Sequence, residues 1–158
     1  MKIAVFSDSH GYSDNMIRVL QSTPFDMVIH LGDYIRDVQL IQKQFRTIPF
    51  EYVAGNGDYF TSSQTTEKTL VIQNKKIFIT HGHIQLRRND YENLKRIGNK
   101  TDCDAIFFGH THIPWNEPVN GKLYLNPGSI SFPRSQSGTT FAIVEIEDDK
   151  LSANIFQC

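Results

Sequence analysis

Cysteine is scarce in this sequence. The two cysteines, Cys103 and Cys158, have no neighbours at zinc-finger or redox-motif spacing. A chain of 158 residues can bury about two-thirds of its surface on folding, so it needs no disulfide bond for stability. We therefore expect no disulfide and a reducing compartment, which means a cytoplasmic location.

The sequence also lacks a long apolar run and an excess of charge. Residues 1–6 are too short a run for a signal peptide or a membrane span, so we expect no membrane association. The net charge of -1 gives no general attraction for nucleic acid, and we expect no long nucleic acid as a partner. An anionic ligand would need a local positive charge, which a bound cation could provide.

Strand-like and helix-like patterns alternate in the first third of the chain. We predict strands at residues 3–6, 27–31 and 52–54, and helices at 15–21 and 38–45. Short crossovers connect parallel neighbours, so the three strands should end at one edge of a sheet. Ligands bind at such edges in α/β proteins.

The second half is richer in predicted strands. Asn74-Lys75 and Asp148-Asp149 are typical of hairpin turns, and residues 88–97 have helical periodicity. The strands are predicted at residues 70–73, 76–80, 105–108, 123–125, 140–146 and 151–156. With no repeat, linker or low-complexity segment, the pattern predicts one α/β domain spanning residues 1–158.

Five polar clusters stand at predicted strand ends. They are Asp8-Ser9-His10, Gly32-Asp33, Gly55-Asn56, His81-Gly82-His83 and Gly109-His110-Thr111-His112. Carboxylate, amide and imidazole groups are suitable ligands for divalent Mn, Fe, Zn, Ni or Mg. In Asp-x-His and His-x-His the two side chains are two residues apart, so an extended segment directs both to the same side. The neighbouring glycines allow sharp turns around a compact ion site.

The order of these clusters resembles the calcineurin-like metallophosphoesterase superfamily. Residues 1–11 and Asn126-Pro127-Gly128-Ser129 are most similar to its small YfcE-like phosphodiesterase branch, and the resemblance covers nearly the whole chain. It implies the four-layer metallophosphoesterase fold, in which two packed mixed β-sheets are flanked by α-helices.

The resemblance also implies two divalent metal ions, with manganese expected first and nickel, zinc, iron or magnesium as alternatives. The first ion would be bound by Asp8, His10, Asp33 and His112. The second would be bound by Asp33, Asn56, His81 and His110, so that Asp33 bridges the two. The implied activity is hydrolysis of a small phosphodiester by attack of metal-activated hydroxide on phosphorus, with Asn56 facing the phosphate oxygens.

Four residues near these motifs need separate interpretation. Gly57 stands where many members carry a histidine that protonates the leaving group, so the general acid is left open. Asp58 is interpreted as closing its own turn, although it could partly replace that histidine. His83 is interpreted as a neighbour of the site or a substrate contact, and Arg134 as a loop residue that could reach a substrate phosphate.

A second interpretation is a protein-binding scaffold that resembles the vacuolar-sorting subunit of retromer. A scaffold needs an exposed apolar patch, and Phe60, Trp115 and Phe132 are candidates for one. Competent side chains at every implied ligand position favour an enzyme instead. Whether the chain forms a homo-oligomer is left open.

Overall fold

The fold is described from a computed structural model that covers residues 1–59, 65–86 and 91–158. One five-stranded sheet contains β1 (Lys2–Phe6), β2 (Met27–His30), β3 (Phe50–Tyr52), β9 (Thr140–Glu147) and β10 (Lys150–Gln157), in the order β10-β9-β1-β2-β3. The other contains β4 (Glu67–Ile72), β5 (Lys75–Thr80), β6 (Ala105–Phe107), β7 (Trp115–Val119) and β8 (Lys122–Asn126), in the order β4-β5-β6-β8-β7.

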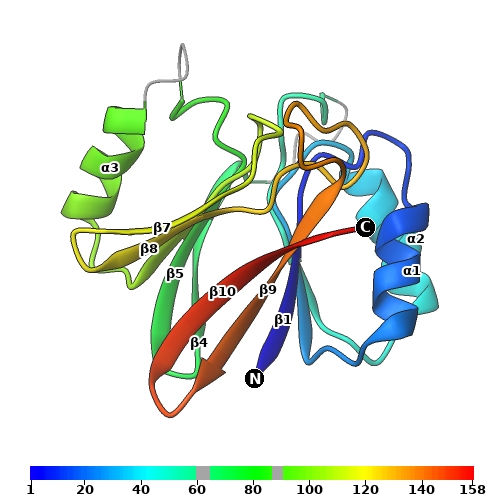
Figure 1. The fold of residues 1–158 in the computed structure, drawn as a ribbon, viewed down its shortest axis with the longest axis horizontal. Helices are drawn as coiled ribbons and strands as arrows, with labels where there is room; N and C mark the ends of the chain where they lie inside the picture. The colour runs from blue at the N-terminus through cyan, green and yellow to red at the C-terminus, as the bar shows by residue number, and fades with distance from the viewer. Residues whose placement is uncertain (60–64, 87–90) are drawn as a thin grey trace.

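The described residues form three helices, which cover the outer faces of the sheets. They are α1 (Asp14–Ser22), α2 (Ile35–Gln44) and α3 (Tyr91–Lys100). Figure 1 shows α1 and α2 beside the first sheet and α3 on the far side of the second. The predicted four-layer α/β architecture is therefore confirmed.

The alternation of side chains along β1 explains this layering. Ile3 and Val5 belong to the apolar cluster between the two sheets, whereas Ala4 and Phe6 pack with helix residues such as Met16. Because successive strand residues point to opposite faces, an uninterrupted apolar run suits a strand buried on both sides. A third cluster packs α3 against the second sheet.

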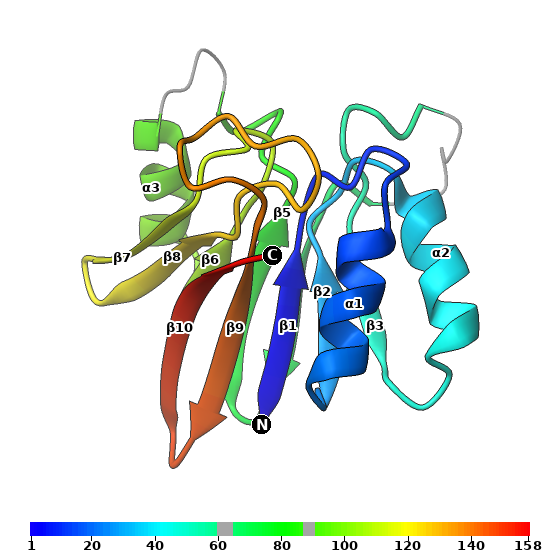
Figure 2. The same cartoon turned by 45° about the vertical axis from the view of Figure 1, so that its right-hand side comes forward.

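Parallel pairing brings the carboxyl ends of the central strands to one end of the molecule. β2 pairs in parallel with both β1 and β3, and β6 pairs in parallel with both β5 and β8. The prediction that the first three strands end at one edge is confirmed. The loops that follow the carboxyl ends of these strands gather at the top of Figure 2.

The hairpin turns are close to the predicted positions. Gln73 and Asn74 have positive φ angles between β4 and β5, so that turn lies one residue earlier than expected. Asp148 and Asp149 have positive φ angles between β9 and β10, as predicted.

Other boundaries differ from the prediction. β3 lies two residues earlier, and α2 begins three residues earlier than expected. β7 was missed because Pro118 and its polar neighbours hide the strand pattern, and proline is tolerated there because β7 is an edge strand. The predicted helix at residues 88–97 is observed from Tyr91, and residues 88–90 lie outside the described part of the chain.

Cys103 is buried and Cys158 is exposed, and both are free. None of the helices in the described residues is long and apolar enough to cross a membrane.

Candidate metal centre

Two buried aspartates lie at the centre of the candidate site. Asp8 follows β1 and Asp33 follows β2, and their exposed fractions are 0% and 3%. Both have left-handed backbone conformations, with φ angles of 57° and 60°. His10, His110 and His112 are left-handed as well. Such conformations cost energy in residues other than glycine and concentrate at functional sites.

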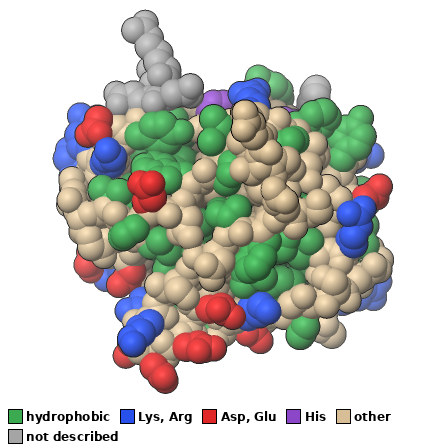
Figure 3. Space-filling model, viewed as in Figure 1, with side chains coloured by type: hydrophobic (Ala, Val, Ile, Leu, Met, Phe, Trp, Pro, Cys, Tyr) green, Lys and Arg blue, Asp and Glu red, His purple; other side chains and the backbone are tan. Residues whose placement is uncertain are grey.

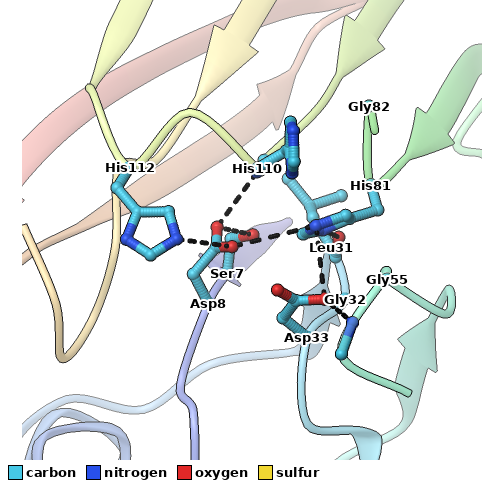
Figure 4. A network of polar contacts seen from close by, with 12 residues as sticks. Ser7, Asp8, Leu31, Gly32, Asp33, Gly55, His81, Gly82, His110 and His112 are labelled. Atoms are coloured by element: carbon cyan, nitrogen blue, oxygen red, sulfur yellow. Dashed lines mark hydrogen bonds and ion pairs between the residues drawn. The ribbon is translucent and has the colours of Figure 1, made fainter. Parts of the chain in front are cut away.

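The two oxygens of Asp33 face different histidines. Its Oδ1 lies 3.4 Å from Nε2 of His81, and its Oδ2 lies 3.7 Å from Nε2 of His10. The Oδ1 atom of Asp8 lies 3.2 Å from Nε2 of His112 and 3.9 Å from Nε2 of both His10 and His81. Figure 4 shows His81 and His112 reaching the Asp8 carboxylate from opposite sides.

Backbone carbonyls fix the orientation of two of these histidines. Nδ1 of His81 lies 2.7 Å from the carbonyl oxygen of Leu31, and Nδ1 of His112 lies 2.5 Å from that of Phe132. A carbonyl can only accept, so each Nδ1 must carry the proton. In a neutral imidazole the lone pair is then on Nε2, which faces the carboxylates.

Several buried polar atoms in the cluster have no hydrogen-bond partner among the described residues. They include Asp8 Oδ1, His81 Nε2 and Asn56 Oδ1. Native proteins rarely leave such atoms unsatisfied, and a lone pair aimed at a carboxylate oxygen is repulsive. A divalent cation between these acceptors would satisfy them together, so the residues fit a metal ion.

Two groups of side chains have ligand atoms close enough to share an ion. One contains Asp8, His10 and His112, and the other contains Asp8, Asp33 and His81, with all ligand atoms of a group within 4.8 Å of one another. Asp8 belongs to both groups, whereas the sequence interpretation gave the bridging role to Asp33. The distances above bring Asp33 near histidines of both groups as well.

Asn56 and His110 are the remaining predicted ligands. Asn56 lies in the turn after β3, and its unpartnered Oδ1 is an acceptor. The His110 ring centroid lies 5.2 Å from that of His81, and the His110 backbone N–H donates to Asp8 Oδ2 over 3.1 Å. His83 stands beside them, with its ring centroid 5.4 Å from that of His81. All the predicted ligand residues thus come from the loops at one end of the sheets.

Burial and charge act against each other in this cluster. Burial by itself raises the pKa of Asp8, but His112, His81 and the Ser7 hydroxyl lower it to about 2. Burial lowers the pKa of His10 and of His110. It also lowers that of His112, but the Asp8 carboxylate and the Phe132 carbonyl outweigh burial and raise this pKa overall. Asp8 is therefore an ionised carboxylate, the form in which it can bind a cation.

A serine-rich loop after β8 fixes the Asp8 segment. The hydroxyls of Ser129 and Ser131 both donate to the backbone carbonyl of Asp8, at 2.8 and 2.9 Å. Buried Asn126 donates to Gly109 and to Thr111 in the histidine loop. The sequence interpretation noted this asparagine-to-serine motif but gave it no structural role.

The turn that carries Asn56 is built around two carboxylates. Asp58 accepts hydrogen bonds from the backbone N–H groups of Gly55 and Ile35, so the prediction that it closes the turn is confirmed. Gly57 donates its N–H to Asp33 Oδ1 over 2.7 Å. A Cβ atom at Gly55 would collide with the Asp33 carboxylate. Glycine at 55 is therefore what allows the turn to approach Asp33 so closely.

A surface cavity of about 540 Å³ opens beside this cluster. It is lined by His10, Tyr34, His112, Phe132, Pro133 and Arg134. The sequence interpretation weighed Arg134 as a substrate contact but assigned no role to Tyr34. The sequence gives no signal for Tyr34, because no motif connects it with the loop containing Arg134.

Several known proteins are similar in sequence to this chain. The probable metallophosphoesterase YsnB of Bacillus subtilis is 31% identical over 158 residues, covering 99% of this chain and 90% of YsnB. The phosphodiesterase YfcE of Escherichia coli is 29% identical over 83 residues, 52% of this chain and 40% of YfcE. The similarity to the YfcE-like branch that the sequence indicated is thus confirmed.

Solved structures share the architecture. A predicted phosphoesterase from Streptococcus pneumoniae has a TM-score of 0.83 and 28% identity, covering 99% of this chain and 88% of that protein. The Vps29 protein of Entamoeba histolytica in complex with zinc has a TM-score of 0.81 and 26% identity, covering 98% and 91%. The model of the calcineurin-like phosphoesterase superfamily domain matches residues 1–149. The chain belongs to the calcineurin-like phosphoesterase superfamily.

Proposed function

We propose that this protein is a dinuclear metal-dependent phosphodiesterase that hydrolyses a small phosphodiester. One observation carries the proposal. The Nε2 atoms of His81 and His112, oriented by backbone carbonyls, face the buried carboxylates of Asp33 and Asp8. This arrangement suits divalent cations and is costly without them.

The proposed ligand sets follow the sequence interpretation. The first set is Asp8, His10, Asp33 and His112, and the second is Asp33, Asn56, His81 and His110. Asp33 is the proposed shared ligand because each of its oxygens approaches a histidine of a different set. Manganese is the first cation to test, with nickel, zinc, iron and magnesium after it.

When bound, the cations would supply Lewis acidity that lowers the pKa of water and offsets the charge of the phosphate. Asn56 is proposed to bind a phosphate oxygen through its amide as well. Gly57 has no side chain with which to protonate a leaving group, and its N–H is already bonded to Asp33. Substrates whose leaving groups need little protonation should therefore be preferred.

The test is a metal add-back experiment. The purified protein is stripped of metal and assayed with bis(p-nitrophenyl) phosphate and p-nitrophenyl phosphate, with each cation added in turn. We expect no turnover without metal, recovery with manganese, and a higher kcat/KM for the diester than for the monoester. A higher kcat/KM for the monoester would overturn the proposal that the protein is a diesterase. No turnover with any cation would overturn the proposal that it is an enzyme.

The second candidate is a protein-binding scaffold, favoured by the similarity to Vps29. Of the proposed patch residues, Trp115 packs against Tyr91 and Phe108, and Phe60 lies outside the described residues. Phe132 is 47% exposed but lines the cavity beside the metal cluster. A scaffold would retain partner binding in an Asp33→Asn variant, whereas an enzyme would lose its turnover.

A further inference from the structure

We infer that the cavity beside His10 and His112 binds a flat aromatic group of the substrate between Tyr34 and Phe132, while Arg134 contacts the phosphate. The inference rests on the proposed function, because it names the chemical class of ester that the same site accepts. The class is aromatic phosphate esters, whether a simple aryl group or a nucleobase. Neither aromatic residue is a proposed metal ligand.

Two exposed aromatic rings contact a proposed metal ligand. Tyr34 is 41% exposed and Phe132 is 47% exposed. Their ring centroids lie 5.3 and 5.6 Å from that of His10, and both contacts are edge-to-face. A substrate whose phosphate reached His10 would bring its ester group next to both rings. Figure 3 shows hydrophobic and basic side chains beside the histidines at the upper rim of the molecule.

Hydrogen bonds fix one wall of the cavity relative to the ligand His112. The Phe132 carbonyl accepts from His112 Nδ1, and the Arg134 N–H donates to the His112 carbonyl over 3.2 Å. The Phe132 N–H donates to Ser129 Oγ over 2.8 Å, and the Tyr12 ring supports the Phe132 ring edge-on at 5.3 Å. Because these contacts already hold the backbone of this wall and support the Phe132 ring, less of the wall must be ordered when a ligand enters, which favours binding.

The part of the lining that contains Tyr34 is held by the backbone. Tyr34 has a φ angle of 74° immediately before α2, and it follows Asp33, whose φ angle is 60°. Two consecutive left-handed residues other than glycine are unusual. The strained turn directs the Asp33 carboxylate into the cluster and leaves the Tyr34 ring at the cavity rim. Asparagine accepts this conformation better than tyrosine does, so Tyr34→Asn removes the ring without adding backbone strain.

Arg134 is the charged group suited to a phosphate. It is the one lysine or arginine that lines this cavity, and its guanidinium has no hydrogen bond or ion pair within the described residues. A guanidinium can bind two phosphate oxygens at once, which a lysine cannot match. In a protein with a net charge of -1, an arginine next to the proposed metal ligands provides local attraction for an anion.

The remaining lining favours an aromatic occupant over a sugar or an alkyl chain. Apart from the two histidines and Arg134, the cavity is lined by Tyr34, Phe132 and Pro133. These side chains offer ring faces and edges but only one hydroxyl for hydrogen bonding. Stacking on aromatic side chains suits any flat base or aryl group, whatever its substituents.

The test measures binding, so it does not depend on turnover. Phenyl phosphate and methyl phosphate are titrated calorimetrically into manganese-loaded protein. We expect phenyl phosphate to bind about tenfold more tightly, the lower part of the range for stacking on aromatic side chains. Phe132→Ala and Tyr34→Asn should reduce this preference. Phe132→Leu, which keeps apolar area without a ring, should restore only part of it.

Arg134→Ala should reduce the affinity for both esters by about the same factor, about tenfold, and Arg134→Lys should recover part of that affinity. Arg46→Ala, at an exposed arginine beyond α2, is the matched control and should bind both esters as the unmodified protein does. Equal affinity of the unmodified protein for the two esters, no binding of either, or a preference unchanged in all the aromatic variants would each overturn the inference.

A parallel turnover assay with bis(p-nitrophenyl) phosphate separates the two proposals. Turnover without an aromatic binding preference would overturn this inference and leave the proposed function standing. An aromatic preference without turnover would support the subsite and count against the enzyme.

Discussion

Metal binding should raise the thermal stability of the protein, and the proposed ligand sets predict by how much in each variant. The buried acceptors Asp8 Oδ1 and His81 Nε2 have no hydrogen-bond partner among the described residues, so the metal-free cluster is destabilised by their contact. A cation at a hundredfold excess over its Kd stabilises the folded state by about 2.7 kcal/mol. For a chain of this size that corresponds to roughly 5 to 11 °C in Tm for each site.

Single substitutions should show how much of the manganese-induced rise in Tm each proposed site contributes. Asp33→Asn weakens a ligand of both proposed sites and should lose most of the manganese-induced rise in Tm. His81→Ala affects the second site and His112→Ala the first, so each should retain about the contribution of the other site. Asp149→Asn is the matched control, because Asp149 is exposed in the β9–β10 hairpin and asparagine suits its φ angle of 62°.

The measurement is calorimetric melting of metal-stripped protein with and without manganese. A full shift in Asp33→Asn would refute the bridging role. Loss of the whole shift in Asp8→Asn, with only half lost in Asp33→Asn, would make Asp8 the shared ligand instead. No shift in the unmodified protein would refute the metal centre.

Three further substitutions test how the fold supports the site. Gly55→Ala should reduce manganese affinity, measured calorimetrically, because its Cβ would displace the Asp33 carboxylate. Asn126→Ala should lower the free energy of unfolding in urea by about 2 to 4 kcal/mol, because buried groups in the Gly109 loop lose their partners; a change below 1 kcal/mol would contradict this role. Gly98→Ala should destabilise by about 1 to 2 kcal/mol in urea despite better helix propensity, because its Cβ collides with the Tyr124 hydroxyl. Adding Tyr124→Phe removes the hydroxyl and should relieve that collision. If Gly98→Ala alone left the free energy of unfolding unchanged, the collision would not occur.

Sequence pattern predicted the parts of this fold that local physics determines. The apolar strands of the first sheet and their parallel order follow from short crossovers and from runs buried on both faces. The Asp148-Asp149 turn follows from the left-handed preference of aspartate. β7 could not be predicted, because an edge strand needs little apolar character and can contain proline.

The candidate site was predictable in composition but not in geometry. Motif order identified the polar residues that the structure brings together, from Asp8 to His112. Which oxygen faces which histidine depends on contacts between distant loops, such as the bond from His81 to the Leu31 carbonyl. Tyr34 and Arg134 line the same cavity although they are far apart in the sequence, and only the tertiary structure shows that they are neighbours there.

The dinuclear mechanism is tested by the rate at which manganese-loaded protein hydrolyses bis(p-nitrophenyl) phosphate, compared between the unmodified chain, Asp33→Asn and the control Asp149→Asn. We expect Asp33→Asn to lose more than about a hundredfold in kcat/KM, since even residues behind metal ligands typically contribute 10- to 100-fold. Asp149→Asn should retain full activity. Equal turnover in Asp33→Asn, or full turnover in protein stripped of metal, would contradict the dinuclear mechanism.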